Sequence, residues 1–256
     1  MDKDRHISVV GILNITPDSF FESSRVEADR AMGRIEKMIS EGADVIDIGA
    51  CSTRPGSAPA NEETEWQRLE PVLKDAAMAF AGAQFSIDTF RSSIVRKAFD
   101  VIGPFTVNDV TAGDADPAML STVAELGLEY VATHNRPCRD GSVVENIAGF
   151  FDVFAAKAKD AGVVDWWLDP GFGFSKTLEQ NWELARGMQS LLRFGRPVYV
   201  GVSRKSMLTR LLGISPEEAL PATQVLHFML LEKGASALRV HDVAEVCRTV
   251  RLFRQL

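Results

Sequence analysis

Short apolar runs alternate with longer amphipathic stretches along the whole chain. The apolar runs cover residues 9–15, 44–50, 85–90, 105–109, 129–134, 166–172, 197–203 and 237–242. Short apolar runs bounded by turn residues are typical of buried strands, whereas apolar positions three or four residues apart indicate helices. Helices are expected at 24–41, 61–81, 91–100, 116–126, 143–161, 177–193, 216–233 and 243–254. The pattern therefore predicts eight consecutive strand–helix units.

Glycines and prolines mark the expected boundaries. Seven glycines each follow an amphipathic stretch and precede an apolar run: Gly42, Gly82, Gly103, Gly127, Gly162, Gly195 and Gly234. Glycine commonly ends a helix because it adopts the left-handed conformation without steric cost. Asp116-Pro117 and Ser215-Pro216 would place proline at the first helical position, where its missing N–H costs no hydrogen bond. These signals support the predicted division into strands and helices.

Eight such units in 256 residues match the size and order of a single (β/α)8 TIM barrel that uses residues 1–256 as one domain. A doubly wound open sheet alternates in the same way and is the structural alternative. Polar residues finish nearly every apolar run: Asn14, Asp47, Asp88, Asn108, His134, Asp169, Ser203 and His241. In a barrel these strand ends converge on one mouth, whereas an open sheet spreads them along an edge. This convergence and the absence of a second domain favour the barrel.

Composition narrows the class of protein. The chain is 46% hydrophobic with a net charge of −7, and its Lys and Arg residues are spread out, which argues against a nucleic-acid partner. Its three cysteines are widely separated and form neither a disulfide framework nor a zinc-ligand spacing. The N-terminus lacks the apolar core of a signal peptide, and no run reaches the ~18 residues of a membrane span. We therefore expect a cytoplasmic protein with no membrane partner.

Two strand-end carboxylates stand out. Asp and Asn at such positions often cap the next helix or start a turn, and this explanation covers any one of the eight taken alone. Asp47 and Asp88 differ because apolar residues flank them on both sides. A buried carboxylate costs several kcal/mol unless it is paired, so each should face a ligand or a partner. For Asp47, a structural contact to a neighbouring strand is the alternative.

The segment "DPGFGFSKT", residues 169–177, resembles a phosphate-binding loop only superficially, because Lys176 stands where that motif requires glycine. Its glycines would let the chain turn tightly after Asp169 and present Phe172 and Phe174 to a pocket. Packing of both phenylalanines between helices explains the segment equally well.

Cationic residues follow the last two strands. Ser203, Arg204, Lys205 and Ser206 lie near the start of a helix, so backbone N–H groups and two cations together predict an anion site. Arg239 and His241 are two residues apart and therefore share one face of a strand, which would bring both into the barrel mouth beside the first strand. A solvated arginine and a core histidine are the alternatives.

Seven stretches, in order, closely resemble the dihydropteroate synthase family: "GILNITPDSF", "DIGACSTRPGS", "SIDTF", "VNDV", "LDPGFGFSKTLEQN", "VGVSRKSML" and "RVHDV". The family is a pterin-binding barrel of the folate pathway and the target of sulfonamide inhibitors. The resemblance implies that the chain condenses 6-hydroxymethyl-7,8-dihydropterin pyrophosphate with 4-aminobenzoate to give 7,8-dihydropteroate and pyrophosphate.

The resemblance also implies residue roles. The pterin would contact Asp88, Asn108, Asp169, Lys205 and Arg239. The diphosphate would contact Asn14, Thr53, Arg54, Arg239 and His241, with Asn14 also a ligand of Mg2+. The 4-aminobenzoate would lie against Phe20, Pro55, Phe174 and Ser206. The catalytic group would comprise Asp88, Lys205, Arg239, His241, Thr53 and Arg54.

The implied mechanism is dissociative: Mg2+ and the cations stabilise departing pyrophosphate, and the arylamine attacks the resulting carbocation. The resemblance further implies a homodimer formed through the late helices, where "TQVLHFMLLEKGA" is strongly apolar. A folate-dependent methyltransferase would share the pterin contacts but not need the cations of "SRKS" and "RVHD". A non-catalytic pterin-binding paralogue would lose the loop residues. The chain has both these cations and the loop residues, which favours an active synthase.

Overall fold

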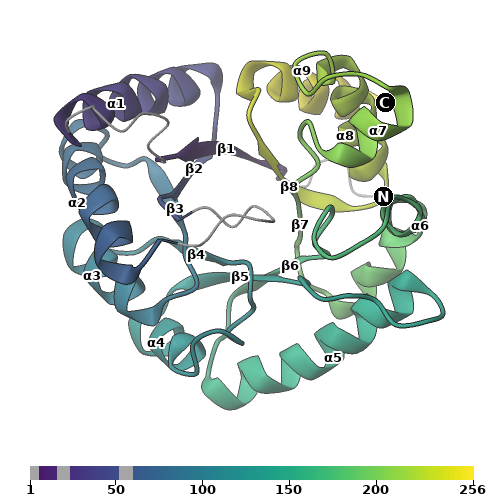
Figure 1. Cartoon of the computed structure of the whole chain (residues 1–256), viewed down its shortest axis with the longest axis horizontal. Helices are drawn as coiled ribbons and strands as arrows, with labels where there is room; N and C mark the ends of the chain where they lie inside the picture. Colours follow the sequence, from purple (N-terminus) through teal and green to yellow (C-terminus); the bar gives the residue numbers. More distant parts are fainter. Residues whose placement is uncertain (1–5, 16–23, 52–59) are drawn as a thin grey trace.

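The computed structural model describes residues 6–15, 24–51 and 60–256 and contains a closed barrel of parallel strands (Figure 1). The strands are β1 (Ser8–Asn14), β2 (Val45–Gly49), β3 (Gln84–Asp88), β4 (Thr106–Asp109), β5 (Glu129–Thr133), β6 (Trp166–Asp169), β7 (Val198–Val200) and β8 (Ala235–Val240). They pair in chain order, and β8 pairs with β1. The predicted (β/α)8 barrel is confirmed, and the open sheet is excluded by the β1–β8 pairing.

Helices surround the barrel on its outside (Figure 1). They are α1 (Ser24–Glu41), α2 (Glu62–Ala79), α3 (Ser92–Ile102), α4 (Met119–Leu126), α5 (Val143–Ala161), α6 (Leu178–Gly187), α7 (Ser206–Leu212), α8 (Leu220–Glu232) and α9 (Val243–Phe253). The helix expected at 177–193 divides into α6 and a 3-10 helix, η1 (Met188–Phe194). The short helix α7 lies outside those eight ranges, but it begins at Ser206, where the helix start next to Lys205 was expected.

The two prolines proposed as first helical residues do not start helices. Asp116 instead accepts hydrogen bonds from the backbone N–H of Ser92 at 2.7 Å and of Ala118 at 2.9 Å. Its carboxylate therefore holds a turn against α3, and α4 begins only at Met119. Likewise, the N–H of Ser215 donates to Glu218, and α8 begins four residues after Pro216.

All seven glycines predicted to end helices have positive φ angles, from 61° at Gly195 to 100° at Gly42 and Gly234. Gly127 and Gly162 have the left-handed conformation at the C-caps of α4 and α5, and their N–H groups close the final turns. The glycines predicted to end helices therefore have the backbone conformation expected of them.

The hydrophobic core has two parts. The larger part lies between the barrel and the helices, and a smaller cluster of Val10, Val131, Tyr199 and Ala237, with Val45 and Trp167 packed against it, fills the barrel interior. Because side chains alternate along a strand, the next inward residues toward the mouth are Asp47 after Val45, Asp169 after Trp167 and Arg239 after Ala237. A polar layer thus sits directly above an apolar floor.

Across the ranges just given, no helix is long and apolar enough to cross a membrane. The three cysteines are free, and Cys51 is buried.

Candidate active site

Arg239 forms the centre of the polar layer. Its Nε donates to Asp47 Oδ2 at 2.6 Å, and its Nη2 donates to Asp88 Oδ2 at 2.8 Å. Asn108 Nδ2 donates to the same Asp47 oxygen at 3.1 Å. Asp47 has no solvent exposure, whereas the side chains of Asp88 and Arg239 remain 17% and 22% exposed. Asp47 is therefore a structural partner, and the pair of Asp88 and Arg239 lies open to a ligand.

Burial raises the pKa values of two carboxyl groups in this layer. Burial raises the pKa of Asp88 to about 7 despite the attraction of Arg239, and Asp47 and Asp109 raise it further. Burial also raises the pKa of Asp169, against the attraction of Lys205. Because Asp47 and Asp88 share one guanidinium, the site holds excess negative charge. Hydrogen-bond donors on a ligand would be favoured there.

Lys205 links the ends of β6 and β7. Its Nζ donates to the carbonyl of Phe172 and lies 4.7 Å from the centroid of the Phe174 ring. Burial lowers the pKa of Lys205 to about 8, opposed by Asp169. Asp169 accepts the N–H of Gly171 at 2.7 Å. The ammonium and carboxylate thus belong to one electrostatic unit at the mouth.

The two phenylalanines after Asp169 have different positions. Phe172 has no solvent exposure and belongs to the core between barrel and helices, so its predicted presentation to a pocket is wrong. Phe174 is half-buried and faces Lys205. Gly171 makes this turn possible: its φ is +72°, and a Cβ added there would lie 2.0 Å from the carbonyl oxygen of His134. Only glycine permits such an approach of two backbones.

Arg204 does not belong to the predicted anion site. Its Nε and Nη2 donate to the two carboxylate oxygens of Asp242 at 2.9 and 2.7 Å. Its Nη1 donates to the carbonyls of Pro216 and Glu217. These contacts use the guanidinium to tie the β7–α7 turn to the end of β8. Of the two adjacent cations, only Lys205 faces the mouth.

His241 follows β8 directly and contacts Ser203. Its backbone N–H lies 3.3 Å, and its Nδ1 3.2 Å, from the Ser203 hydroxyl. The hydroxyl accepts from the backbone and can donate to Nδ1, which leaves Nε2–H for another partner. The protein atoms around the ring, and then Arg239, lower the pKa of His241, so the ring is neutral although another part of the residue faces solvent. The residue is exposed, so the core alternative is excluded.

Asn14 is exposed at the end of β1, on the strand that pairs with β8. In the described part of the chain no hydrogen bond engages its amide, and no group of three or more His, Cys, Asp or Glu residues could hold a metal. Mg2+ commonly takes one or two protein oxygens together with phosphate oxygens and water. An exposed amide oxygen at the mouth fits that ligand set.

Of the remaining predicted site residues, the structure describes Ser206 but not the four loop residues. Ser206 is exposed at the first position of α7, next to Lys205. Thr53, Arg54, Phe20 and Pro55 lie outside the described residues.

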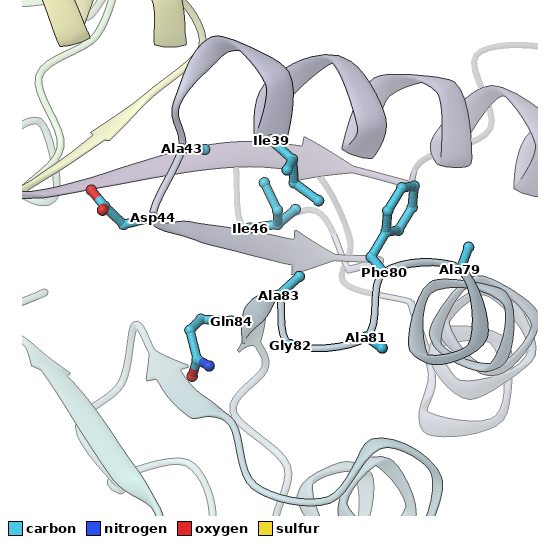
Figure 2. A pocket seen from close by; sticks show the side chains of 10 residues that line it. All are labelled: Ile39, Ala43, Asp44, Ile46, Ala79, Phe80, Ala81, Gly82, Ala83 and Gln84. Carbon is cyan, nitrogen blue, oxygen red and sulfur yellow. The ribbon is translucent and has the colours of Figure 1, made fainter.

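A separate pocket of about 570 Å3 lies at the opposite end of the barrel. Figure 2 shows that its lining comes from the end of α1, the starts of β2 and β3, and the connection between α2 and β3. Its one carboxylate, Asp44, already accepts the N–H of Val9 at 2.7 Å. Since barrel enzymes carry their chemistry at the carboxyl ends of the strands, this pocket is not the candidate site.

Lys176 is a half-buried polar residue to which the sequence reasoning gave no role. Its ammonium contacts three carbonyl oxygens and the ring of His134. A lysine inside an apolar segment of glycines and phenylalanines is the sequence feature that could have indicated such a role.

The chain is similar to known proteins over almost its whole length. The pattern of the family described as "Pterin binding enzyme" matches residues 10–241. A dihydropteroate synthase of Streptococcus pyogenes is 36% identical over 99% of this chain and 97% of its own length. A solved Clostridium difficile dihydropteroate synthase with pteroic acid has a TM-score of 0.93 and 33% identity, covering 100% of this chain and 98% of that one. A Xanthomonas albilineans dihydropteroate synthase with 4-aminobenzoic acid has a TM-score of 0.90 and 33% identity, covering 99% of this chain and 93% of that one. The chain is therefore a transferase that belongs to the pterin-binding enzyme family, within the group of dihydropteroate synthases.

Proposed function

We propose that the chain condenses 6-hydroxymethyl-7,8-dihydropterin pyrophosphate with 4-aminobenzoate to form 7,8-dihydropteroate and pyrophosphate. The observation that carries the proposal is the cluster at the barrel mouth, where the ion pair of Asp88 and Arg239 lies open beside Lys205 and Asp169. Similar solved proteins with pteroic acid or 4-aminobenzoic acid support the same pair of substrates.

The pterin ring would lie over the polar layer. Its ring and amino N–H groups would donate to Asp88 and Asp169, which are acceptors when ionised. Lys205 and Asn108 would donate to the ring oxygen and nitrogen atoms. Arg239 would offer its guanidinium plane for stacking, because Asp47 and Asp88 already hold that plane in place. The excess negative charge of the layer would favour the electron-poor ring formed as pyrophosphate departs.

The diphosphate would lie between the ends of β1 and β8. His241 would donate from Nε2, Arg239 would supply positive charge, and Asn14 would hold Mg2+ through its amide oxygen. Thr53 and Arg54 are assigned to the same group by resemblance. Mg2+, when bound, supplies charge that stabilises the leaving pyrophosphate. In a dissociative reaction the carbon–oxygen bond breaks before the arylamine nitrogen bonds to carbon, so the chain's residues orient both substrates and exclude water.

The 4-aminobenzoate would lie outside the pterin. Phe174 offers a half-buried ring beside Lys205, and the exposed hydroxyl of Ser206 can donate to the benzoate carboxylate. Phe20 and Pro55 would complete the ring contacts by resemblance. Sulfonamides resemble 4-aminobenzoate in shape and charge, so they would compete for this position.

The test is a pyrophosphate-release assay with purified protein. Release is expected only when the pterin pyrophosphate, 4-aminobenzoate and Mg2+ are all present, and 7,8-dihydropteroate should form in equal amount. Asp88→Asn should lose most of this activity, whereas Asp75→Asn, a change at a helix residue away from the mouth, should retain it. Pterin binding without turnover would indicate a non-catalytic paralogue instead.

The proposal includes a homodimer formed through the late helices. Large apolar side chains are exposed on them: Leu211 and Leu212 on α7, Val225 and Met229 on α8, and Leu252 on α9. Since a monomer gains nothing from exposing such a group of residues, a second copy is the proposed cover. Light scattering should give twice the chain mass, and Val225→Glu combined with Met229→Glu should give the monomer mass.

A further inference from the structure

We propose that Lys176 is a positioning residue for the pterin site. Its ammonium would hold the β6–α6 loop against the end of β5 and so fix the two groups of that loop that contact Lys205. The inference deepens the proposed function and rests on it for its kinetic consequences.

The contacts of Lys176 all lie within two segments. Its Nζ lies 2.9 Å from the carbonyl oxygen of Gly171, 3.3 Å from that of Phe174 and 3.1 Å from that of His134. It also lies 3.1 Å from Nδ1 of His134. An ammonium has three hydrogens, so these four acceptors account for all of its donors. Lys176 therefore joins the loop to the strand end through several bonds at once.

Among the described residues, no carboxylate forms a salt bridge with Lys176. Its charge instead faces carbonyl dipoles and an imidazole, and burial lowers its pKa to about 8. Cys138 and Asp169 oppose this shift only from a distance, so the hydrogen bonds to the carbonyls carry most of the compensation for placing the ammonium there.

The loop backbone has an unusual conformation. Gly171, Gly173 and Ser175 have φ angles of +72°, +79° and +49°. This backbone turns the carbonyls of Gly171 and Phe174 toward one point, where their negative ends would repel without a cation. Lys176 supplies that cation from within the same loop.

The other side of the loop serves Lys205. The carbonyl of Phe172 accepts from its ammonium, and the ring of Phe174 lies beneath it. The carbonyls of one short loop thus bind two different lysines. Moving the carbonyls held by Lys176 would move the groups that orient Lys205 in the site.

The start of α6 has its own support. Asn181 accepts the N–H of Gly173 at 2.6 Å and donates to the carbonyl of Thr177 at 2.7 Å. Thr177 and Gln180 also form a capping box. Loss of Lys176 should therefore disturb residues 171–176 while α6 stays folded.

The experiment compares Lys176→Met, which keeps most of the length of the side chain and removes its charge, with Lys176→Arg and with Lys157→Met as a surface control. Lys157 is half-exposed and faces Asp114 at 3.4 Å. We expect Lys176→Met to raise the KM for the pterin pyrophosphate about tenfold or more and to lower kcat, with far-UV circular dichroism unchanged. The KM and kcat of Lys176→Arg should lie between those of Lys176→Met and the parent, because the planar guanidinium group cannot direct its N–H groups at carbonyls that converge on one point. Lys157→Met should match the parent.

A crystal structure of Lys176→Met tests the geometry without relying on activity. The proposal requires the Phe172 carbonyl to leave hydrogen-bonding distance of Lys205. An unchanged loop would overturn it, as would a lowered melting temperature with both KM values unchanged. If the parent protein lacks synthase activity, the proposed function fails while the crystal structure still decides the role of Lys176. If Lys176→Met does not fold, the structure and KM of Lys176→Arg decide it by the same criteria.

Discussion

Arg239→Met removes the guanidinium that Asp47 and Asp88 share and leaves both carboxylates in the barrel interior. The bonds lost are 2.6 Å and 2.8 Å long, from groups that are at most 22% exposed. Charge centres in such pairs lie about 4 Å apart, so each pair contributes about 4 kcal/mol at an effective dielectric constant of about 20. Repulsion between the carboxylates and the desolvation of arginine offset part of this sum. Since breaking a buried pair costs about 3–5 kcal/mol, we expect a loss of about 4 kcal/mol at pH 8.

The loss should depend on pH in a defined direction. The pKa of Asp88 is raised from 3.8 to about 7 even with Arg239 present, and removing the cation raises it further. Between the unfolded and folded pKa values, the folded chain binds a proton that the unfolded chain lacks. Stability therefore increases as pH falls through the folded pKa. In the variant, the free energy of unfolding rises over a wider pH range than in the parent. The stability lost through Arg239→Met should therefore be smaller by about 1–2 kcal/mol at pH 5.5 than at pH 8.

Urea denaturation followed by tryptophan fluorescence at the two pH values measures both quantities. Arg96→Met is the control, because it removes an exposed pair with Glu125 and should barely change the unfolding midpoint. A deficit below about 1 kcal/mol at pH 8, or an equal deficit at both pH values, would refute the reasoning about shared burial.

Three further outcomes follow from individual contacts. Gly171→Ala should lower the melting temperature strongly, because the added Cβ meets the carbonyl of His134. Gly33→Ala is the control, since its Cβ would have no neighbour within 4 Å, and equal effects of the two substitutions would contradict this reasoning. The KM for the pterin substrate should rise about tenfold per pH unit below pH 7, as Asp88 takes up a proton, and Asp88→Asn should show a raised but flat profile. A parent profile without this limb would exclude ionised Asp88 as the acceptor. Ser206→Ala should raise the KM for 4-aminobenzoate about tenfold while the pterin KM stays constant, and steady-state kinetics with each substrate varied decide this.

The chain of strands and helices could be predicted because its signals are local. Apolar runs and helix-ending glycines lie within a few residues of the boundaries that they mark, and the observed φ angles agree with them. Local signals failed where a side chain made a distant contact. Asp116 was expected to start a helix, and its bond to Ser92, 24 residues earlier in the chain, holds a turn instead.

The candidate site was predictable as a set of residues but not as an arrangement. Phe172 and Phe174 are indistinguishable in sequence, yet one is core and the other faces Lys205. Arg204 and Lys205 are adjacent cations, and the positive φ of Arg204 helps turn one toward Asp242 while the other faces the mouth.

By itself, the sequence determined the number and order of the strands and the kinds of group at the strand ends, since periodicity and backbone preference act over a few residues. Only the tertiary structure decided that Asp47 pairs with Arg239, a residue 192 positions away, and that Lys176 gathers the carbonyls of its own loop. Such contacts depend on barrel closure and strand register, which no local pattern encodes. Those distant contacts turn a set of polar strand ends into a site.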